Sequence, residues 1–509
     1  MFKKHPKGLL AASFANMGER FGFYTMMAIL TLFLMSKFGL DETKAGIIYS
    51  IFYFSIYILA FVGGLIADKT RNYKGIILIG LILMAVGYLM IAIPTPTPVP
   101  AGSFGIYLAM TCAGLFVIAF GNGLFKGNLQ ALVGQMYDNE EYSGQRDSGF
   151  SLFYMFINVG AIFAPFAAVG MRNWWLKSHG FAYNSDLPAL CHEQLKGTLS
   201  TDAATRLHDL ATNVGYSGTD LTAFSKEYLN LFATGFHYAF AIAIGAMLIS
   251  LVVYLINKKS FPNPKDISEK SSSSNVEMDV AEIKQRLYAL FAVFGVVIFF
   301  WFSFHQNGLT LTYFAKDYIN LSGIVVDLGF TTIQGAEIFQ SINPIFVVLL
   351  TPVIMSLFGF LRAKGIEPST PKKIAIGMGI AALAYVTMSL GSMGLPAKSV
   401  ITEMGGLPDA QRVTPFLLIG TYLILTIAEL FISPMGISFV SKVAPPKYQG
   451  IMQGCWLGAT AVGNQLLFIG AIFYKSIPVS MTWLIFVGAC SISMFTMIGM
   501  LKWLERITK

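Results

Sequence analysis

The sequence predicts an all-α membrane protein built from two bundles of six transmembrane helices. Hydrophobic residues make up 55% of the 509 positions and charged residues only 12%, whereas a soluble globular domain carries about a quarter charged residues. Apolar stretches long enough to cross about 30 Å of hydrocarbon recur along the whole chain. A polar segment rich in serine and lysine divides these stretches into two equal sets. Together these observations indicate a polytopic protein made of two halves.

The candidate spans follow one another with short gaps, and their even number places both termini on one side of the membrane. We predict about twelve spans, near residues 9–36, 43–68, 74–94, 103–129, 148–171, 229–257, 284–316, 336–361, 372–393, 413–438, 448–473 and 479–503. Lysines and arginines gather in alternate gaps, such as Lys69, Arg71 and Lys74, while the gap IPTPTPVPAGS carries none. By the positive-inside rule, both termini are expected in the cytoplasm.

Two longer gaps define the domain organisation. Residues 172–228 are polar with mixed charge, and we interpret them as an external loop; a surface excursion with no active role is the simpler alternative. Residues 258–283 predict a flexible cytoplasmic linker. The N-terminal bundle is therefore expected over residues 1–257, and the C-terminal bundle over residues 284–509.

Composition and motifs argue against several other classes. The net charge of +8 comes mostly from the short gaps between spans, so nucleic-acid binding is not expected. The four cysteines offer neither a disulfide framework nor metal-ligand spacing, and we expect no metal and no cofactor. No HExxH, GxSxG or paired aspartates occur in the spans, which argues against an intramembrane enzyme. A channel would need rings of repeated ligands, and only scattered charges are present.

A few ionisable residues lie well inside the predicted spans, namely Glu19, Arg20, Lys126, His305 and Glu429. On helix-insertion scales, an arginine near the bilayer centre costs about 2.5 to 3.5 kcal/mol, so these residues are expected to have a role. Static ion pairs between helices are the structural alternative. Polar groups spread over two halves are typical of transporters with a site between the halves.

The charges of the two halves differ in sign. Arg20 shares a helical stripe with Asn16 and Tyr24, which lie four residues before and after it. Arg20 and Lys126 would give the N-terminal half a cationic pocket, whereas Glu429 gives the C-terminal half a carboxylate. This asymmetry favours a ligand with one negative and one positive end over a sugar or a simple ion.

Motifs on several spans add to this pattern. The first span reads NMGERFGFY, the fifth FYMFINVGAIFAP, the eighth FQSINP and the tenth AELFISPMG. They resemble the motifs of the proton-dependent oligopeptide transporter family, a branch of the major facilitator superfamily, whose first helix carries E-x-x-E-R-F-x-Y-Y. The resemblance implies the major facilitator fold, here without the extra helix pair that many bacterial relatives insert between the bundles.

The resemblance also implies a function and a set of site residues. A functional monomer in a bacterial inner membrane would import di- and tripeptides by alternating access, with proton symport. Arg20 and Lys126 would bind the peptide carboxylate; Asn158, Asn343 and Glu429 would bind its amino terminus; Tyr24 and Tyr57 would line the pocket; and Trp301 and Trp456 would shape the side-chain space. For the tryptophans, packing or an interfacial belt is an equal alternative. For the asparagines, the rival is an interhelical hydrogen bond.

Two departures from the family pattern bear on proton coupling. Asn16 replaces the first glutamate and cannot titrate, and His305 lies where the family usually carries glutamate. A neutral imidazole cannot form an ion pair with Lys126. Histidine nevertheless titrates near pH 6.5 when unperturbed, so we expect symport to persist through Glu19 and His305. The residues considered for coupling are Glu19, Arg20, Lys126, His305 and Glu429.

Several alternatives stay open at this point. Within the family, the chain could carry nitrate or a modified peptide, or it could be weakly coupled or uncoupled from protons. A channel is the more distant alternative.

Overall fold

The computed structural model describes residues 5–137, 141–142, 146–262, 279–445 and 448–508. Within them, twelve helical segments are long and apolar enough to cross a membrane, which confirms the predicted number of spans. Their helices are α1 (Lys7–Phe38), α2 (Glu42–Thr70), α3 (Tyr73–Ala92), α4 (Phe104–Gln135), α5 (Arg146–Ser178), α8 (Leu221–Asn257), α9 (Val280–Phe304) with α10 (Thr310–Tyr318), α11 (Ile342–Ala363), α12 (Thr370–Gly391), α14 (Phe416–Val443), α15 (Gln449–Gln465) with α16 (Leu467–Ser476), and α17 (Val479–Thr508).

Shorter elements connect these spans. They are the helices α6 (Leu187–Lys196), α7 (Thr201–Asn213) and α13 (Lys398–Glu403), the strands β1 (Val326–Asp327) and β2 (Thr332–Ile333), and the 3-10 helices η2 (Ala101–Ser103), η4 (Lys258–Ser260), η6 (His305–Gly308), η7 (Ser322–Ile324), η8 (Ala336–Ser341) and η9 (Asp409–Gln411). The two strands pair antiparallel as a small hairpin. Residues 263–278, part of the predicted linker, lie outside the described residues.

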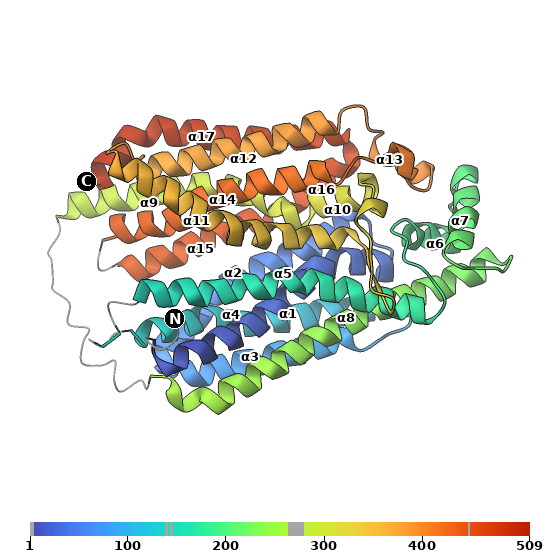
Figure 1. Ribbon diagram of the computed structural model, residues 1–509, viewed down its shortest axis with the longest axis horizontal. Helices are drawn as coiled ribbons and strands as arrows, with labels where there is room; N and C mark the ends of the chain where they lie inside the picture. Colours follow the sequence, from blue (N-terminus) through green and yellow to red (C-terminus); the bar gives the residue numbers. More distant parts are fainter. Residues whose placement is uncertain (1–4, 138–140, 143–145, 263–278, 446–447, 509) are drawn as a thin grey trace.

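The spans form two bundles that lie against each other (Figure 1). In the first, α1 packs on α5 and α8, and α4 packs on α2 and α3; in the second, α12 packs on α14 and α17. Both termini lie at one end of the molecule, which we call the terminal end. The opposite end carries α6, α7 and α13, and we call it the loop end (Figure 1).

Small residues allow close helix approach in the first bundle. A Cβ atom added to Gly63 of α2 would collide with the carbonyl oxygen of Gly123 in α4, and one added to Gly80 of α3 would lie 2.7 Å from the Gly121 carbonyl oxygen. Such contacts replace the hydrophobic driving force that is missing between helices in lipid. They fix α4 firmly against α2 and α3.

The predicted seventh span is broken in the structure. α9 ends at Phe304, η6 follows, and α10 begins at Thr310. Non-helical backbone at membrane depth must find hydrogen-bond partners in the protein, and here Tyr422 Oη donates to the Asn307 carbonyl oxygen at 2.7 Å. Gln306 Nε2 donates to the carbonyl oxygen of Leu467 at 3.2 Å. The break therefore lies where neighbouring helices can compensate for it.

The predicted boundaries near the long loop also differ. α5 extends to Ser178 and the sixth spanning helix, α8, begins at Leu221 rather than near residue 229. Asp220 caps α8, because its carboxylate accepts hydrogen bonds from the backbone N–H groups of Thr222 and Ala223. Residues 172–228, the predicted external loop, include the end of α5, the helices α6 and α7, and the first turns of α8.

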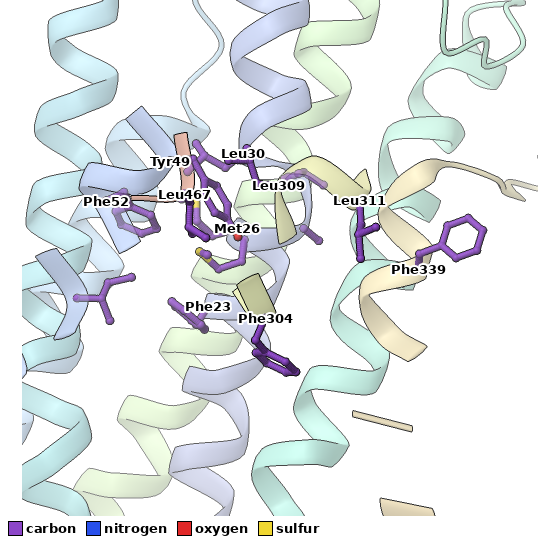
Figure 2. Close-up of a cluster of buried hydrophobic side chains, with 14 of the residues drawn as sticks. Phe23, Met26, Leu30, Tyr49, Phe52, Phe304, Leu309, Leu311, Phe339 and Leu467 are labelled. Carbon is purple, nitrogen blue, oxygen red and sulfur yellow. The ribbon is translucent and has the colours of Figure 1, made fainter. Parts of the chain in front are cut away.

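Apolar side chains from both bundles meet in one buried cluster (Figure 2). Phe23, Met26 and Leu30 come from α1, and Figure 2 shows them close to Tyr49, Phe304 and Leu467. Phe304 and Leu467 belong to the second bundle, so the core is continuous across the interface between the halves.

Candidate functional site

A cavity of about 230 Å³ lies between the two bundles, with walls from both of them. The first bundle contributes side chains of α1, α2, α4 and α5, and the second contributes side chains of α9, η6, η8, α11 and α14. Of the residues predicted for substrate binding, those that line this cavity are Arg20, Tyr24, Tyr57, Lys126, Asn158, Trp301, Asn343 and Glu429. His305 lines it as well.

Arg20 is paired within its own helix. Its Nε donates to Glu19 Oε2 at 2.6 Å and its Nη2 donates to Glu19 Oε1 at 2.8 Å. Asn122 Nδ2 also donates to Glu19 Oε1, at 2.6 Å, and the guanidinium lies over the ring of Phe23. Glu19 is buried and does not line the cavity. Since this pair is bidentate and locally compensated, the expected cationic pocket reduces largely to Lys126.

Lys126 presents its charge to the cavity. Its ammonium lies 4.7 Å from the centre of the Tyr57 ring, a cation–π contact. In the part of the chain that the structure describes, Lys126 forms no ion pair. A half-buried ammonium without a carboxylate partner is costly, so this side chain is poised to bind an anionic group.

Glu429 gives the opposite wall its negative charge. Its Oε2 accepts a hydrogen bond from Asn343 Nδ2 at 2.9 Å, and the same amide donates to Thr426 Oγ1 at 3.0 Å. Glu429 has no ion pair with any described residue. Asn343 thus links α11 to α14 and orients the Glu429 carboxylate. It makes the interhelical hydrogen bond considered as the alternative role, and it also lies in the cavity wall.

Asn158 behaves differently from Asn343. Its Nδ2 donates to the carbonyl oxygen of Tyr154 at 3.1 Å, one turn earlier in the same helix. No interhelical bond from this amide is present among the described residues, and the side chain lines the cavity.

His305 lies in an aromatic slot at the broken seventh span. Its ring stacks on Trp301 with the ring centres 4.9 Å apart, and the Tyr53 ring lies 4.8 Å away on a tilted plane. Nδ1 forms a short hydrogen bond with Asn464 Oδ1. The imidazole is therefore held by Asn464 rather than by Lys126.

Trp456 does not line the cavity. Its ring packs against Gly436, where an added Cβ atom would collide with it, and lies 6.2 Å from the ring centre of Phe294. The packing alternative fits this tryptophan, whereas Trp301 faces the cavity. The predicted pair therefore divides, because Trp301 lines the cavity whereas the ring of Trp456 packs against Gly436 and Phe294 of its own half.

Sequence reasoning missed several wall residues. Tyr49 and Tyr53 precede Tyr57 by two turns and one turn of α2, and all three line the cavity. The stretch YSIFYFSIY carries this i, i+4, i+8 spacing, which could have revealed the stripe. Gln130 and Asn307 also line the wall, and no comparable signal singles them out.

The two halves are tied together at the loop end. The ion pairs that cross between them are Arg172–Glu337, Lys177–Asp327 at 3.4 Å, Asp186–Arg412 at 2.7 Å, Glu42–Lys398 at 3.2 Å and Asp41–Lys475 at 2.9 Å. Burial alone would lower the pKa of Lys398, but the carboxylates of Asp317 and Glu42 raise it above its usual value. Among the described residues, no ion pair joins the halves at the terminal end. Within the described residues, the ion pairs between the halves are therefore confined to the loop end.

Residues that could hold a metal are not gathered anywhere in the described part of the chain. No group of three or more histidine, cysteine, aspartate or glutamate side chains is arranged for coordination there. The site consists of opposite charges, amides and aromatic rings.

Comparison with known proteins gives a consistent result. The chain matches the sequence profile of the POT family over residues 74–278 and 266–484. It is 29% identical over 495 residues to the peptide transporter YePEPT of Yersinia enterocolitica, covering 91% of this chain and 87% of that protein. It is 27% identical over 485 residues to the dipeptide and tripeptide permease B of Xenorhabdus bovienii, covering 91% and 86%.

Solved structures agree on the fold. A crystal structure of a peptide transporter POT in complex with sulfate superposes with a TM-score of 0.72 at 22% identity, covering 100% of this chain and 96% of that one. A POT family transporter in complex with 5-aminolevulinic acid gives 0.71 at 21% identity, covering 100% and 98%. These similarities confirm the predicted major facilitator fold.

Proposed function

The chain belongs to the POT family, and on that premise we propose that it imports di- and tripeptides by alternating access through the cavity between its two bundles. The relatives at 29% and 27% identity are named as a peptide transporter and as a dipeptide and tripeptide permease. The protein is a multi-pass membrane protein, and in this proposal the peptide crosses the membrane without chemical conversion.

One observation carries the proposal. The cavity has a positive group on one bundle, Lys126, and a negative group on the other, Glu429, and neither forms an ion pair with a described residue. A peptide at neutral pH carries a carboxylate at one end and an ammonium at the other. Each charge of the peptide would meet an opposite charge in the cavity. Folding has already removed water from Lys126 and Glu429, so binding would not incur that cost again. A zwitterionic peptide would therefore bridge the two halves.

Further wall residues complete the proposed site. Arg20 would help Lys126 bind the peptide carboxylate through the guanidinium N–H groups that do not bind Glu19. Asn343 would orient Glu429 toward the peptide ammonium. Asn158 would offer an amide oxygen to that same ammonium. The aromatic rings of the wall would contact the peptide side chains; they include Tyr24, Tyr57 and Trp301.

We also propose proton symport through Glu19 and His305, in a functional monomer of a bacterial inner membrane. Protonation of Glu19 would remove the bidentate partner of Arg20 and so free the guanidinium for the cavity. Protonation of His305 would place a positive charge in the wall that the second bundle contributes, across the cavity from Lys126 of the first bundle. In this membrane, both termini would face the cytoplasm and the loop end would face the periplasm.

Uptake of labelled dialanine into proteoliposomes tests the transport function. We expect saturable uptake that unlabelled di- and tripeptides inhibit and that nitrate does not, with strongly reduced uptake for Arg20→Ala. Inhibition by nitrate in place of peptides would favour the anion carrier. Uptake that does not saturate would indicate a channel.

A further inference from the structure

The segment between α5 and α8 docks on the opposite half of the molecule. Through its chain connections it belongs to the first bundle, yet α7 lies beside α13 and the residues that follow it (Figure 1). We call α6, α7 and their connections, residues 181–220, the cap. The segment that receives it, residues 398–412, belongs to the second bundle, and we call it the receiving loop.

Polar contacts join the cap to the backbone of the receiving loop. Arg206 Nε donates to the Gly405 carbonyl oxygen at 2.9 Å, and Arg206 Nη2 donates to the Leu407 carbonyl oxygen at 3.2 Å. Ser200 Oγ donates to the Glu403 carbonyl oxygen at 2.6 Å. One arginine and one serine of α7 and its N-cap thus satisfy three carbonyl groups of the other half.

A carboxylate of the cap lies between two arginines. Asp186 Oδ2 accepts from Arg206 Nη2 at 3.0 Å and from Arg412 Nη2 at 2.7 Å. Arg206 comes from the cap itself, whereas Arg412 comes from the receiving loop. The side chains of Asp186 and Arg412 are only 7% and 4% exposed, so this pair is shielded from solvent and stronger than a surface pair.

The backbone of the receiving loop fits closely against the cap. Gly405 and Gly406 have φ values of +72° and +117°, which non-glycine residues rarely adopt. A Cβ atom added to Gly405 would lie 3.1 Å from the Ala203 Cα atom, and one added to Gly406 would overlap the Asp186 carboxylate. Apolar side chains complete this contact, since Leu207 of the cap and Leu407 of the receiving loop are fully buried.

The cap is also held by its own bundle. His192 of α6 hydrogen-bonds through Nε2 to the Ser36 carbonyl oxygen of α1 at 2.7 Å, and Gln194 Nε2 donates to Thr222 Oγ1 of α8 at 3.3 Å. α6 forms part of the wall of a cavity of about 300 Å³. The same wall includes Glu42, Lys398 and Lys475, which belong to the ion pairs between the halves. The cap lies over these ties.

We propose that the cap is a latch: the loop end opens only when the cap releases the receiving loop, so that this contact controls the rate of opening. The proposal rests on the proposed function, because alternating access requires the halves to separate at each end in turn. A segment fastened to both halves resists that separation until its contacts with one of them break. The contacts with the receiving loop join different halves, so they are the ones that must break.

A reversible crosslink tests the latch. Ser200 and Glu403 are both exposed, so Ser200→Cys and Glu403→Cys, combined with Cys112→Ser, can be joined by a reductant-cleavable bifunctional thiol reagent. We expect dialanine uptake to fall at least tenfold and to recover after reduction. The matched control joins Gln194→Cys to Thr222→Cys, which links the cap to its own bundle, and should leave uptake unchanged. Undiminished uptake with the Ser200–Glu403 link in place would overturn the proposal.

A second measurement does not depend on any substrate. Spin labels at Lys177→Cys and Asp327→Cys, on opposite halves at the loop end, report its opening as a distance distribution. Arg206→Gln should increase the longer-distance population several-fold. Arg362→Gln, which removes an arginine paired within the second half, should not. An unchanged distribution in Arg206→Gln would contradict the latch, whereas absent peptide uptake by the wild-type protein would contradict only the proposed function.

Discussion

Lys126 and Glu429 line one cavity from opposite halves of the molecule, and neither forms an ion pair with a residue in the described ranges. In a chain with only 12% charged residues, two such groups in one cavity are the clearest functional signal of the structure. They suit a ligand that carries both charges, and they lie in the two parts that alternating access would move relative to each other. The first predictions therefore concern these two residues.

Replacing Lys126 should weaken binding of the peptide carboxylate. For Lys126→Gln we expect dialanine to bind about 10- to 100-fold more weakly, because a hydrogen bond to a charged group contributes about 1.5–3 kcal/mol. Isothermal titration calorimetry in detergent measures this change. Dialanine amide, which lacks the carboxylate, is the matched ligand, and its affinity should hardly respond. Equal losses for both ligands would contradict the assignment.

Replacing Glu429 should produce the mirror result. Glu429→Gln keeps an acceptor for the Asn343 amide but removes the negative charge, so binding of free dialanine should weaken by a similar factor. N-acetyl-dialanine, which lacks the ammonium, should be nearly insensitive in the same titration. A larger loss for the acetylated peptide than for the free one would place the ammonium elsewhere.

Glu19 should be important for stability as well as coupling. Glu19→Gln leaves Arg20 buried without its bidentate partner, which typically costs about 3–5 kcal/mol, so the thermal unfolding midpoint should fall clearly. The double variant Glu19→Gln with Arg20→Gln removes both charges and should recover part of the loss. No difference between the single variant and the wild-type protein would show that the pair is not held as described.

His305 should influence proton movement during uptake. In liposomes with an internal pH dye, wild-type uptake of dialanine should acidify the lumen, and His305→Ala should reduce the protons moved per peptide. His179, an exposed histidine at the loop end, provides the control His179→Ala, which should behave as wild type. Peptide uptake by the wild-type protein without any pH change would rule out symport.

The buried tie between Arg172 and Glu337 should dominate closure of the loop end. Both side chains are fully buried, and Arg172 also lies 4.2 Å from the ring centre of Tyr183. Glu337→Gln should therefore destabilise the closed form by about 3–5 kcal/mol. Asp327→Asn breaks the exposed pair with Lys177 and should cost less than about 1 kcal/mol. Thermal unfolding midpoints of the two variants compare these costs directly, and similar values would contradict this ranking.

The sequence predicts the fold well because the membrane simplifies it. Apolar runs must be helical when no water can satisfy the backbone, so hydropathy alone gives the twelve spans. The break at His305–Gly308 was not predicted, because the groups that compensate for it, such as Tyr422 and Leu467, come from distant parts of the chain. The docking of the cap was not predicted either, because it depends on contacts between residues that are far apart in the sequence.

The candidate site was partly predictable for the same reason. Intramembrane charges such as Lys126 and Glu429 stand out from the apolar background. The contacts of a side chain cannot be read from the sequence in the same way. Arg20 pairs with its neighbour Glu19, and Trp456 packs on Gly436 away from the cavity. These outcomes depend on helix rotation and on side-chain conformations, which the order of residues in one chain does not specify.

Calorimetric titration of the wild-type protein with three ligands tests the central claim most directly: free dialanine, its N-acetylated form and its C-terminal amide. We predict that the free peptide binds at least tenfold more tightly than either blocked form, because only it can satisfy both Lys126 and Glu429. Equal affinity for all three would contradict the claim that opposite charges across the cavity select the ligand.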